Sequence, residues 1–279
     1  MSGASVIVPV RNAVDFIPCQ LDALSLQVAR NGLEVVVVDD ASTDRTPDVV
    51  AQWISREGSG RFRLIRRALR GGPNAARNVG IAAATSDFLL FCDGDDVVSD
   101  GWSDALLAAR NDDVILCGAL ESLSPAANPV EWPLPPTSWG NRYAYGGNMA
   151  VARSIVERLG GFDENIAAGG TELDFALRAR RDAGAKVTAV PAAVVCYRQP
   201  TSSWRFFVWQ FQKERGRRYL RRKYRSDLRK ESIRSSVGAW ARLPALIWQG
   251  LVDRAARQRA ADLAGRVIGR MLWPLLPIR

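Results

Sequence analysis

Residues Val35-Val36-Val37-Val38-Asp39-Asp40-Ala41-Ser42 pass from four consecutive valines straight into two carboxylates and a small polar turn. Short runs of Val, Ile, Leu and Phe are typical of parallel strands that are buried on both faces of a sheet. In open α/β sheets, ligands bind at the carboxyl ends of such strands. The alternative for Asp39 and Asp40 is a solvated turn that caps the next helix. The stretch therefore predicts a buried strand that ends in a binding site or in a capped turn.

Similar apolar runs recur along the chain, and stretches with helical spacing separate them. Strands are expected at 6–10, 35–38, 62–65, 88–92, 114–117, 145–151, 186–190 and 193–197. Helices are expected at 14–28, 47–55, 73–84, 102–109, 153–159 and 171–183. From residue 201 onward only long helical patterns remain. This alternation predicts an α/β sandwich as the catalytic body over 1–200, followed by a basic and amphipathic helical extension over 201–279.

Charge and histidine content exclude several classes of protein. The 279 residues contain 38 Lys and Arg, 29 Asp and Glu and no His, which gives a net charge of +9. Without histidine, Ser-His-Asp and Cys-His catalysis and His-ligated metal sites are excluded. Residues 204–234 hold 12 basic and three acidic residues, so the rest of the chain is neutral. The basic character thus belongs to one segment, which argues against nucleic-acid binding by the body.

The cysteines and the amino-terminal residues predict a cytoplasmic location. Cys19, Cys92, Cys117 and Cys196 lie far apart without a CxxC pair, which is typical of structural thiols in a reducing compartment. The chain starts with a strand-like pattern and lacks the features of a signal peptide. No apolar run approaches the roughly 18 residues of a membrane-spanning helix.

A second acidic cluster, Asp93-Gly94-Asp95-Asp96, follows the expected strand at 88–92. Three carboxylates this close raise the pKa of at least one of them unless a cation lies between them. A hard divalent ion that also bridges substrate phosphates would relieve the repulsion. A solvated turn is the alternative, but the cluster favours metal and nucleotide binding.

Two glycine-containing segments stand at expected helix starts. Gly71-Gly72 lies between Arg70 and Arg77 and could bind an anion through free backbone N–H groups, or it could simply begin a helix. The segment 169–174 places Glu172 and Asp174 in the first turn of a helix, where acids favour the helix dipole even without a function.

Taken together and in order, these motifs resemble the inverting family 2 glycosyltransferases of GT-A fold, over residues 5 to about 200. That fold is a Rossmann-like mixed β-sheet flanked by helices, here with an α-helical C-terminal extension. The motifs are Val8-Pro9-Val10-Arg11-Asn12, Asp39-Asp40-Ala41-Ser42-Thr43-Asp44, Gly71-Gly72-Pro73 with Ala76-Arg77-Asn78, Asp93-Gly94-Asp95-Asp96, Gly146-Gly147-Asn148, Gly160-Gly161-Phe162-Asp163-Glu164 and Gly170-Thr171-Glu172-Leu173-Asp174.

The resemblance implies roles for particular residues. Asp39 would accept a hydrogen bond from a nucleobase N–H, and Asp95, with Asp93, would ligate Mg2+ or Mn2+. Glu172 would be the catalytic base, with Asp174 as its rival, because Thr171 replaces the first acid of the family's usual pair. The full set implied for nucleotide-sugar binding is Pro9, Val10, Arg11, Asp39, Asp40, Arg70, Arg77, Asp93, Gly94, Asp95, Gly147 and Asn148.

The implied reaction is transfer of a sugar from a nucleotide-diphosphate sugar, most simply a UDP-sugar, to a hydroxyl of a saccharide, a lipid-linked acceptor or a small molecule. A carboxylate base suffices for it, so the missing histidine is no obstacle. Some relatives add a histidine to the metal shell, but residues 195–200 supply none, and water or Arg198 would fill that place.

Two other functions and several uses of the extension remain open. A nucleotidyltransferase of similar fold would also gather carboxylates, although residues 10–13 lack its Gly-rich triphosphate loop. A non-catalytic basic interaction protein would leave the acidic clusters unexplained. Residues 204–234 could pack on the body, contact a diphosphate or lie on the inner face of an anionic membrane. Residues 240–252 and 263–278 could be interfacial helices or form a homodimer.

Overall fold

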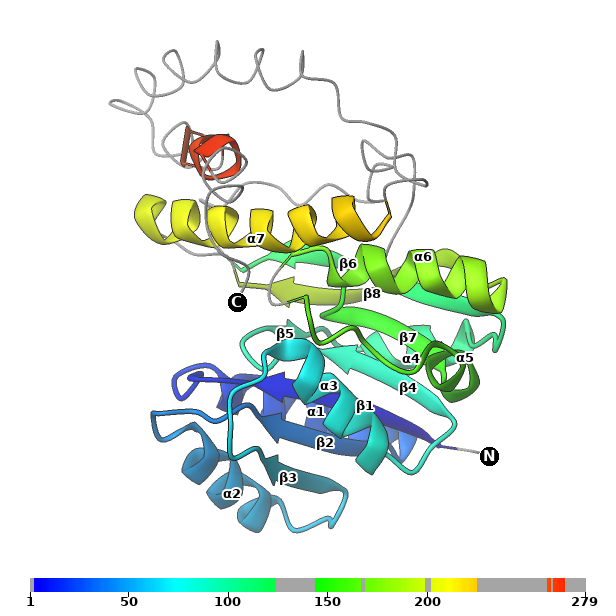
Figure 1. Ribbon diagram of the computed structural model, residues 1–279. Helices are drawn as coiled ribbons and strands as arrows, with labels where there is room; N and C mark the ends of the chain where they lie inside the picture. Colours follow the sequence, from blue (N-terminus) through cyan, green and yellow to red (C-terminus); the bar gives the residue numbers. More distant parts are fainter. Residues whose placement is uncertain are drawn as a thin grey trace.

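The computed structural model describes residues 3–123, 144–166, 169–198, 202–224, 260–261 and 263–268 (Figure 1). Its strands are β1 (Ala4–Val10), β2 (Glu34–Asp39), β3 (Phe62–Arg66), β4 (Phe88–Cys92), β5 (Val97–Val98), β6 (Val114–Ser122), β7 (Asn148–Ala152) and β8 (Lys186–Tyr197). Its helices are α1 (Ile17–Asn31), α2 (Thr46–Glu57), α3 (Pro73–Ala83), α4 (Trp102–Ala108), α5 (Arg153–Leu159), α6 (Thr171–Ala183) and α7 (Ser203–Lys223).

These strands form one mixed sheet in the order β3-β2-β1-β4-β7-β6-β8-β5. The first four are parallel neighbours, and β1 pairs with β2 so that Val10 lies opposite Asp39. Strand β7 enters antiparallel between β4 and β6, while β6 and β8 are parallel to each other. The carboxyl ends of β1, β2 and β4 therefore meet at one edge, which is where the acidic clusters begin.

Several expected boundaries moved for identifiable reasons. The helix expected from residue 14 begins at Ile17, because Pro18 is tolerated only in the first turn of a helix. The two strands expected at 186–190 and 193–197 form the single strand β8, which passes Pro191 opposite a register shift at Gly118/Ala119 of β6. Strand β7 starts only at Asn148, because Gly146 and Gly147 form the turn before it.

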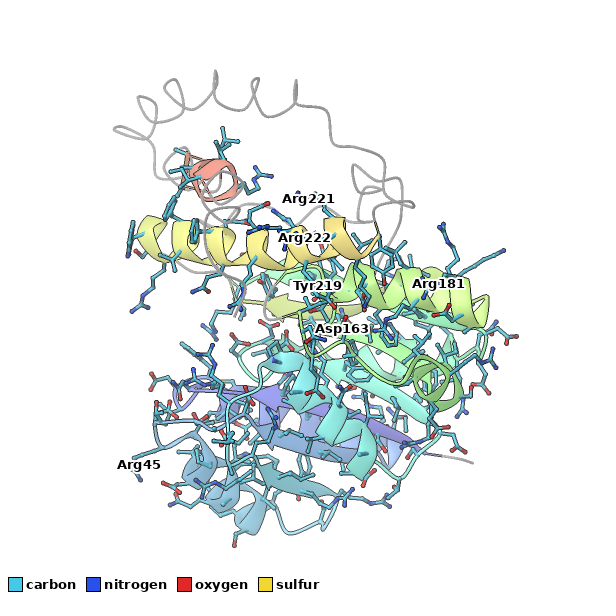
Figure 2. All side chains as sticks on the ribbon, viewed as in Figure 1. Arg45, Asp163, Arg181, Tyr219, Arg221 and Arg222 are labelled. Carbon is cyan, nitrogen blue, oxygen red and sulfur yellow. The ribbon has the colours of Figure 1, made fainter. Side chains whose placement is uncertain are left out.

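The carboxyl end of helix α7 meets the start of α6, above β6 and β8 (Figures 1 and 2). Leu220 and Tyr224 of the α7 end pack with Ile166, Leu173 and Leu177 in a small apolar cluster. Residues 199–201 and 240–252 lie outside the described residues, so the domain boundary near residue 200 and the use of 240–252 stay predictions. Among the described helices, none has the length and apolar character needed to cross a membrane.

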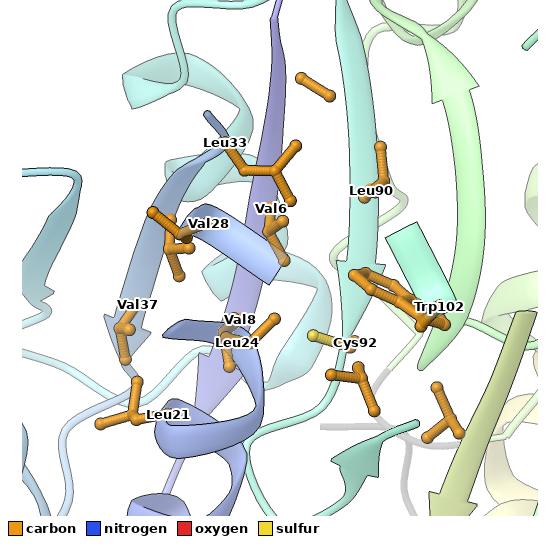
Figure 3. Close-up of a cluster of buried hydrophobic side chains, with 14 of the residues drawn as sticks. Val6, Val8, Leu21, Leu24, Val28, Leu33, Val37, Leu90, Cys92 and Trp102 are labelled. Carbon is orange, nitrogen blue, oxygen red and sulfur yellow. The ribbon is translucent and has the colours of Figure 1, made fainter. Parts of the chain in front are cut away.

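The core divides into two layers because successive residues of each central strand face opposite sides of the sheet. Val6, Val8, Val35 and Val37 pack with α1 and α4 on one side (Figure 3). Ile7, Val36 and Val38 pack with α3 and α6 on the other side. The same layer contains the aromatic side chains Phe91, Phe162 and Phe175. Burial on both faces confirms the interpretation of the valine run, and it holds the strand ends rigidly at the edge.

Candidate active site

Asp39, at the end of β2, has a carboxylate of which only one oxygen accepts a hydrogen bond. The side chain is 1% exposed, and its Oδ2 accepts a hydrogen bond of 3.2 Å from the backbone N–H of Ser42. Its Oδ1 is buried and has no hydrogen-bond partner. An unpaired buried acceptor costs about 1–3 kcal/mol, so it marks a place where a donor from outside the chain would bind.

Asp40, the next residue, is fully engaged inside the protein. Its Oδ1 accepts from the Arg67 guanidinium and from the Gly71 N–H at 2.9 Å, and its Oδ2 accepts from the Gly72 N–H at 2.7 Å. The two N–H groups that could have bound a ligand anion at the start of α3 therefore hold an internal carboxylate. Asp40 anchors the turn before α3, and the structure gives no support to a direct contact with the donor.

The end of β1 packs tightly on the second acidic cluster. The Pro9 carbonyl accepts from the Gly94 N–H at 3.2 Å, and a Cβ at Gly94 would lie 2.8 Å from Val10 Cγ2. Glycine is required at position 94 for this close approach. Arg11 and Arg70 are exposed at the ends of their loops, at this same edge.

Arg77, Asp93 and Glu172 come together around Gly146 and Gly147. Arg77 Nη2 donates to Asp93 Oδ1 at 2.7 Å, and the Arg77 side chain is 4% exposed. A Cβ at Gly146 would lie 2.9 Å from Glu172 Oε1 and 3.2 Å from Arg77 Nη2, and one at Gly147 would lie 2.6 Å from Asp93 Oδ2. Residues from α3, the loop after β4, the turn before β7 and α6 thus form one cluster.

The loop after β4 carries two carboxylates with strongly shifted pKa values. Asp95 is exposed at the surface, but desolvation by the surrounding protein and the charge of Asp93 raise its pKa to about 6. Burial and the charges of Asp95 and Asp93 raise the pKa of Asp96 to about 9. Arg198 fixes this loop, because its N–H donates to Asp96 Oδ1 at 2.8 Å and its Nε donates to the Asp95 carbonyl at 3.0 Å.

This crowding fits a divalent cation. The donors are all carboxylate oxygens, which hard ions such as Mg2+ prefer, and a cation would offset the repulsion that raises both pKa values. Within the described parts of the chain, no three acidic or cysteine side chains converge closely enough to hold a metal by themselves. Asp93 and Asp95 are the side chains suited to share such an ion with a bound diphosphate.

Glu172 and Asp174 differ completely in their surroundings. Both lie in the first turn of α6, but Glu172 is partly exposed beside Gly146, whereas Asp174 is 0% exposed. The Asp174 carboxylate binds Arg178 Nε at 2.8 Å, the Tyr224 hydroxyl at 2.6 Å and Lys223 Nζ at 2.8 Å. With its oxygens occupied in this way, Asp174 is not placed to receive a proton from an acceptor.

Asn148 is a second residue for which the implied contact with the donor finds no support. Its side chain is 0% exposed, its Oδ1 accepts from Trp102 Nε1 at 2.9 Å, and its Nδ2 donates to the carbonyls of Ala119 and Ala193 at 2.6 and 2.9 Å. Every polar atom of the amide is used between β6, β7, β8 and α4. Asn148 therefore joins strands, and Gly147 beside it is the residue that faces Asp93.

Sequence reasoning missed Tyr197, at the end of β8. Burial and the charges of Asp96, Asp95, Asp93 and Glu172 raise the pKa of Tyr197 well above its usual value. Arg67, Lys223 and Tyr224 were missed as well. No sequence motif identifies these residues, because each one binds a carboxylate that lies far away in the sequence.

Comparison with known proteins gives a consistent family and fold. A family model described as Glycosyl transferase family 2 matches residues 5–160. The pre-mycofactocin glycosyltransferase of Mycobacterium tuberculosis is 30% identical over 212 residues, which are 69% of this chain and 42% of that protein. The uncharacterized glycosyltransferase EpsJ of Bacillus subtilis is 36% identical over 117 residues, 41% of this chain and 33% of that protein. The chain thus spans less than half the length of these two relatives.

Solved structures agree with this fold. The mannosyltransferase PcManGT from Pyrobaculum calidifontis, in complex with GDP-Man and Mn2+, has a TM-score of 0.65 at 18% identity and covers 97% of this chain and 86% of that one. S. aureus TarS 1-349 in complex with UDP has a TM-score of 0.53 at 18% identity, over 98% of this chain and 91% of that one. The expected GT-A fold is confirmed.

Proposed function

The chain belongs to glycosyl transferase family 2, and from this premise we propose that it transfers a sugar from a nucleotide-diphosphate sugar to an acceptor hydroxyl with inversion at the anomeric carbon. The observation that carries the proposal is the meeting of Arg77, Asp93 and Glu172 around Gly146 and Gly147. An acid-binding arginine, a metal-binding carboxylate and a free base are the groups that such a transfer needs in one place.

A uracil base would satisfy the unpaired oxygen of Asp39. The N–H of the base would donate to Oδ1, the buried acceptor at the end of β2. We therefore propose a UDP-sugar as donor. Among the related structures, TarS 1-349 binds UDP and UDP-GlcNAc, whereas PcManGT binds GDP-Man, so the nucleobase is the part of the proposal to test first.

Asp95 and Asp93 would hold Mg2+ or Mn2+ at the donor diphosphate. The ion supplies positive charge that offsets the negative charge gathering on the leaving nucleoside diphosphate. Arg198, which is fixed over the Phe16 ring at 4.1 Å and bound to the Asp95 carbonyl, keeps this loop in place. We propose that Arg198 or a water molecule takes the place for which the sequence offers no histidine.

Glu172 would act as the base. Its carboxylate lies at the Gly146 turn, close to the Arg77–Asp93 pair, and none of the contacts that bury Asp174 involve it. It would take the proton of the acceptor hydroxyl while that oxygen attacks the sugar from the face opposite the diphosphate. Arg77 would orient Asp93 toward the donor through their ion pair.

A donor panel tests this function. UDP-, GDP- and dTDP-sugars are incubated with the protein and Mg2+, Mn2+ or EDTA, and release of nucleoside diphosphate is measured, with Glu172→Gln as the matched control. We expect release from a UDP-sugar that requires the metal and Glu172. Pyrophosphate release from a nucleoside triphosphate and a sugar phosphate would indicate a nucleotidyltransferase instead, and no turnover at all would favour an interaction protein.

The basic face of α7 supports a further proposal, association with an anionic membrane surface. Burial and the like charges of Arg222 and Arg221 lower the pKa of Arg218. Arg205 is exposed next to Trp204 at the amino end of α7, and Arg222 is exposed near its carboxyl end. Each basic residue near such a surface contributes about 1 kcal/mol, so Arg205→Gln with Arg222→Gln should remove about 2 kcal/mol and weaken binding to phosphatidylglycerol vesicles about 30-fold. The matched control is Arg45→Gln with Arg56→Gln, since Arg45 lies at the far end of the molecule (Figure 2). Equal binding by both double variants would refute membrane contact through α7.

A further inference from the structure

The carboxyl end of α7 holds the first turn of α6, and this turn carries Glu172. We propose that Tyr224 and Lys223 are positioning residues for Glu172: they fix the turn of α6 through Asp174. This inference rests on the proposed role of Glu172 as the base. It extends that site to a helix that follows the family-matched residues 5–160.

Asp174 is the point at which α7 holds α6. It lies two residues after Glu172, is 0% exposed, and accepts from the Tyr224 hydroxyl at 2.6 Å and from Lys223 Nζ at 2.8 Å. Arg178 completes the set from within α6 at 2.8 Å. A carboxylate that is removed from water and bound by three donors has little freedom, so the backbone on either side of it is fixed too.

Lys223 also joins α6 to the helix that carries Arg77. Its Nζ lies 2.5 Å from Asp163 Oδ2, which also accepts from the Tyr219 hydroxyl at 3.0 Å (Figure 2). The Asp163 carbonyl accepts from Asn74 Nδ2 at 2.8 Å, and Asn74 lies on α3, one turn before Arg77. Lys223 therefore connects the turn of the base with the helix of the Arg77–Asp93 pair in a single frame.

Close backbone contact sets the position of α7 along α6. Gly169 and Gly170, immediately before α6, have φ values of +69° and +97°. A Cβ at Gly169 would lie 2.7 Å from the Lys213 backbone, and one at Gly170 would lie 2.5 Å from Leu220 Cδ1. Side chains at these positions would push the helices apart, so the glycines allow Lys223 and Tyr224 to reach Asp174.

The charges of this contact are stable at ordinary pH. Burial would lower the pKa of Lys223, but hydrogen bonds with Asp163 and Asp174 raise it above the usual value. Burial and the hydrogen bond to Asp174 raise the pKa of Tyr224, so its hydroxyl keeps its proton. The contact is therefore a permanent support for α6.

The consequence for catalysis is geometric. A base must lie within hydrogen-bond reach of the proton that it removes, and a displacement of about 1 Å can cost about 100-fold in rate. Loss of one of three donors to Asp174 should loosen the turn without unfolding it, so we expect an intermediate effect on the rate and little effect on donor binding.

The test compares Tyr224→Phe with Tyr219→Phe in the full chain. Both changes remove one hydroxyl from the same end of α7, but Tyr224 bonds to Asp174 and Tyr219 bonds to Asp163. For Tyr224→Phe we expect kcat for nucleotide release to fall about tenfold with the donor KM within about twofold. Hydrogen exchange should become faster in a peptide covering 169–177 and stay unchanged in one covering 4–10. Tyr219→Phe should leave kcat and both peptides near the wild type.

A second variant, Lys223→Gln, removes the charge that joins Asp163 and Asp174 and should reproduce the loss of kcat and the faster exchange at 169–177. The proposal is overturned if Tyr224→Phe and Tyr219→Phe behave alike, or if exchange at 169–177 does not change in either Tyr224→Phe or Lys223→Gln. If the wild type releases nucleotide from no donor, the proposed function fails, whereas the exchange comparison still decides whether α7 holds α6.

Discussion

The end of β2 and the start of α6 each present two carboxylates, and in both places only one of them is available for chemistry. At β2, Asp40 is bound by Arg67 and two backbone N–H groups, while Asp39 keeps a free buried oxygen. At α6, Asp174 is bound by three side chains, while Glu172 faces the Gly146 turn. In both regions, an acid that is fully bound by the protein lies next to one that is not.

The two regions differ in where the partners of the structural acid come from. Asp40 is held by the loop between β3 and α3, within the parallel half of the sheet. Asp174 is held by α7, 50 residues further along the chain. Asp40, beside the proposed nucleobase contact, is therefore held by a neighbouring loop of the sheet, whereas Asp174, beside the proposed base, depends on a helix that packs against α6.

The largest effect is expected from substituting the two acids at the start of α6 one at a time. Glu172→Gln should lower the rate of nucleotide release by about 1,000-fold, the range of a lost general base, while unfolding stays near the wild type. Asp174→Asn should instead lower the free energy of unfolding by about 3 kcal/mol, because it leaves the mostly buried Arg178 without its carboxylate partner and Lys223 with Asp163 alone. Turnover assays and urea unfolding of both variants measure this. A Glu172→Gln protein with normal turnover beside an inactive, stable Asp174→Asn protein would reverse the assignment.

The loop after β4 carries a third pair of acids, in which we expect Asp95 to serve the reaction and Asp96 to serve the structure. Asp95→Asn should reduce transfer by about 100-fold, since the metal contributes several kcal/mol of charge stabilisation in the transition state. Asp96 is bound to the Arg198 N–H, and its raised pKa makes it protonated at neutral pH without a cation, so Asp96→Asn should cost less than about tenfold. Activity titrated with Mn2+ distinguishes the two. Equal losses would mean that Asp96, too, belongs to the metal site.

At the end of β2, we expect substitution of Asp40 to lower the stability of the fold and substitution of Asp39 to lower the affinity for UDP. Asp40→Asn should lower the free energy of unfolding by about 3 kcal/mol, because it leaves the mostly buried Arg67 without its partner. Asp39→Asn should change stability little and weaken UDP binding about tenfold, the value of one good hydrogen bond. Denaturant unfolding and calorimetric titration with UDP test the pair. Unchanged UDP affinity in Asp39→Asn would contradict the proposed contact with the base.

The smallest effect is expected in the pH dependence of the stability that Asp163 contributes through its contact with α7. Burial would raise the pKa of Asp163, but hydrogen bonds from Lys223, Asn165 and Tyr219 lower it to about 2. Because this value lies below that of an unfolded aspartate, the stabilisation, about 1 kcal/mol once solvent screening is allowed for, is present above about pH 4 and is lost as the pH falls toward 2. Asp163→Asn should therefore be less stable than the wild type at pH 6 and nearly equal to it near pH 2. Urea unfolding at both pH values provides the measurement, and a constant difference would exclude this linkage.

Much of the fold could be predicted because burial on both faces leaves a local signature. The apolar runs located β1, β2 and β4 to within about two residues, since nothing but a central strand requires so many consecutive apolar residues. Strand β5 was missed because two residues show no periodicity. The interruption expected within β8 came from Pro191, which the register shift in β6 accommodates.

The site was predictable to the level of the cluster but not of the single side chain. Strand ends and helix starts predicted where Asp39, Asp93 and Glu172 would gather, and the structure brings Asp93 and Glu172 together. Whether an acid is free depends on partners such as Arg67 or Tyr224, whose identity follows from tertiary packing alone. Asn148 shows the same limit, because its place in a motif does not reveal that its amide is buried between strands.

The arrangement of α6 and α7 also separates two events in the life of a newly made chain. Once β8 has been synthesised, every described strand has its partner, but Lys223 and Tyr224 have still to follow. Until they do, Asp174 lacks two of its three side-chain partners and keeps only Arg178 among them. On the proposed role of this contact, the strands of the sheet can pair before residues 223 and 224 have been added, and the turn that carries the proposed base is fixed only after them.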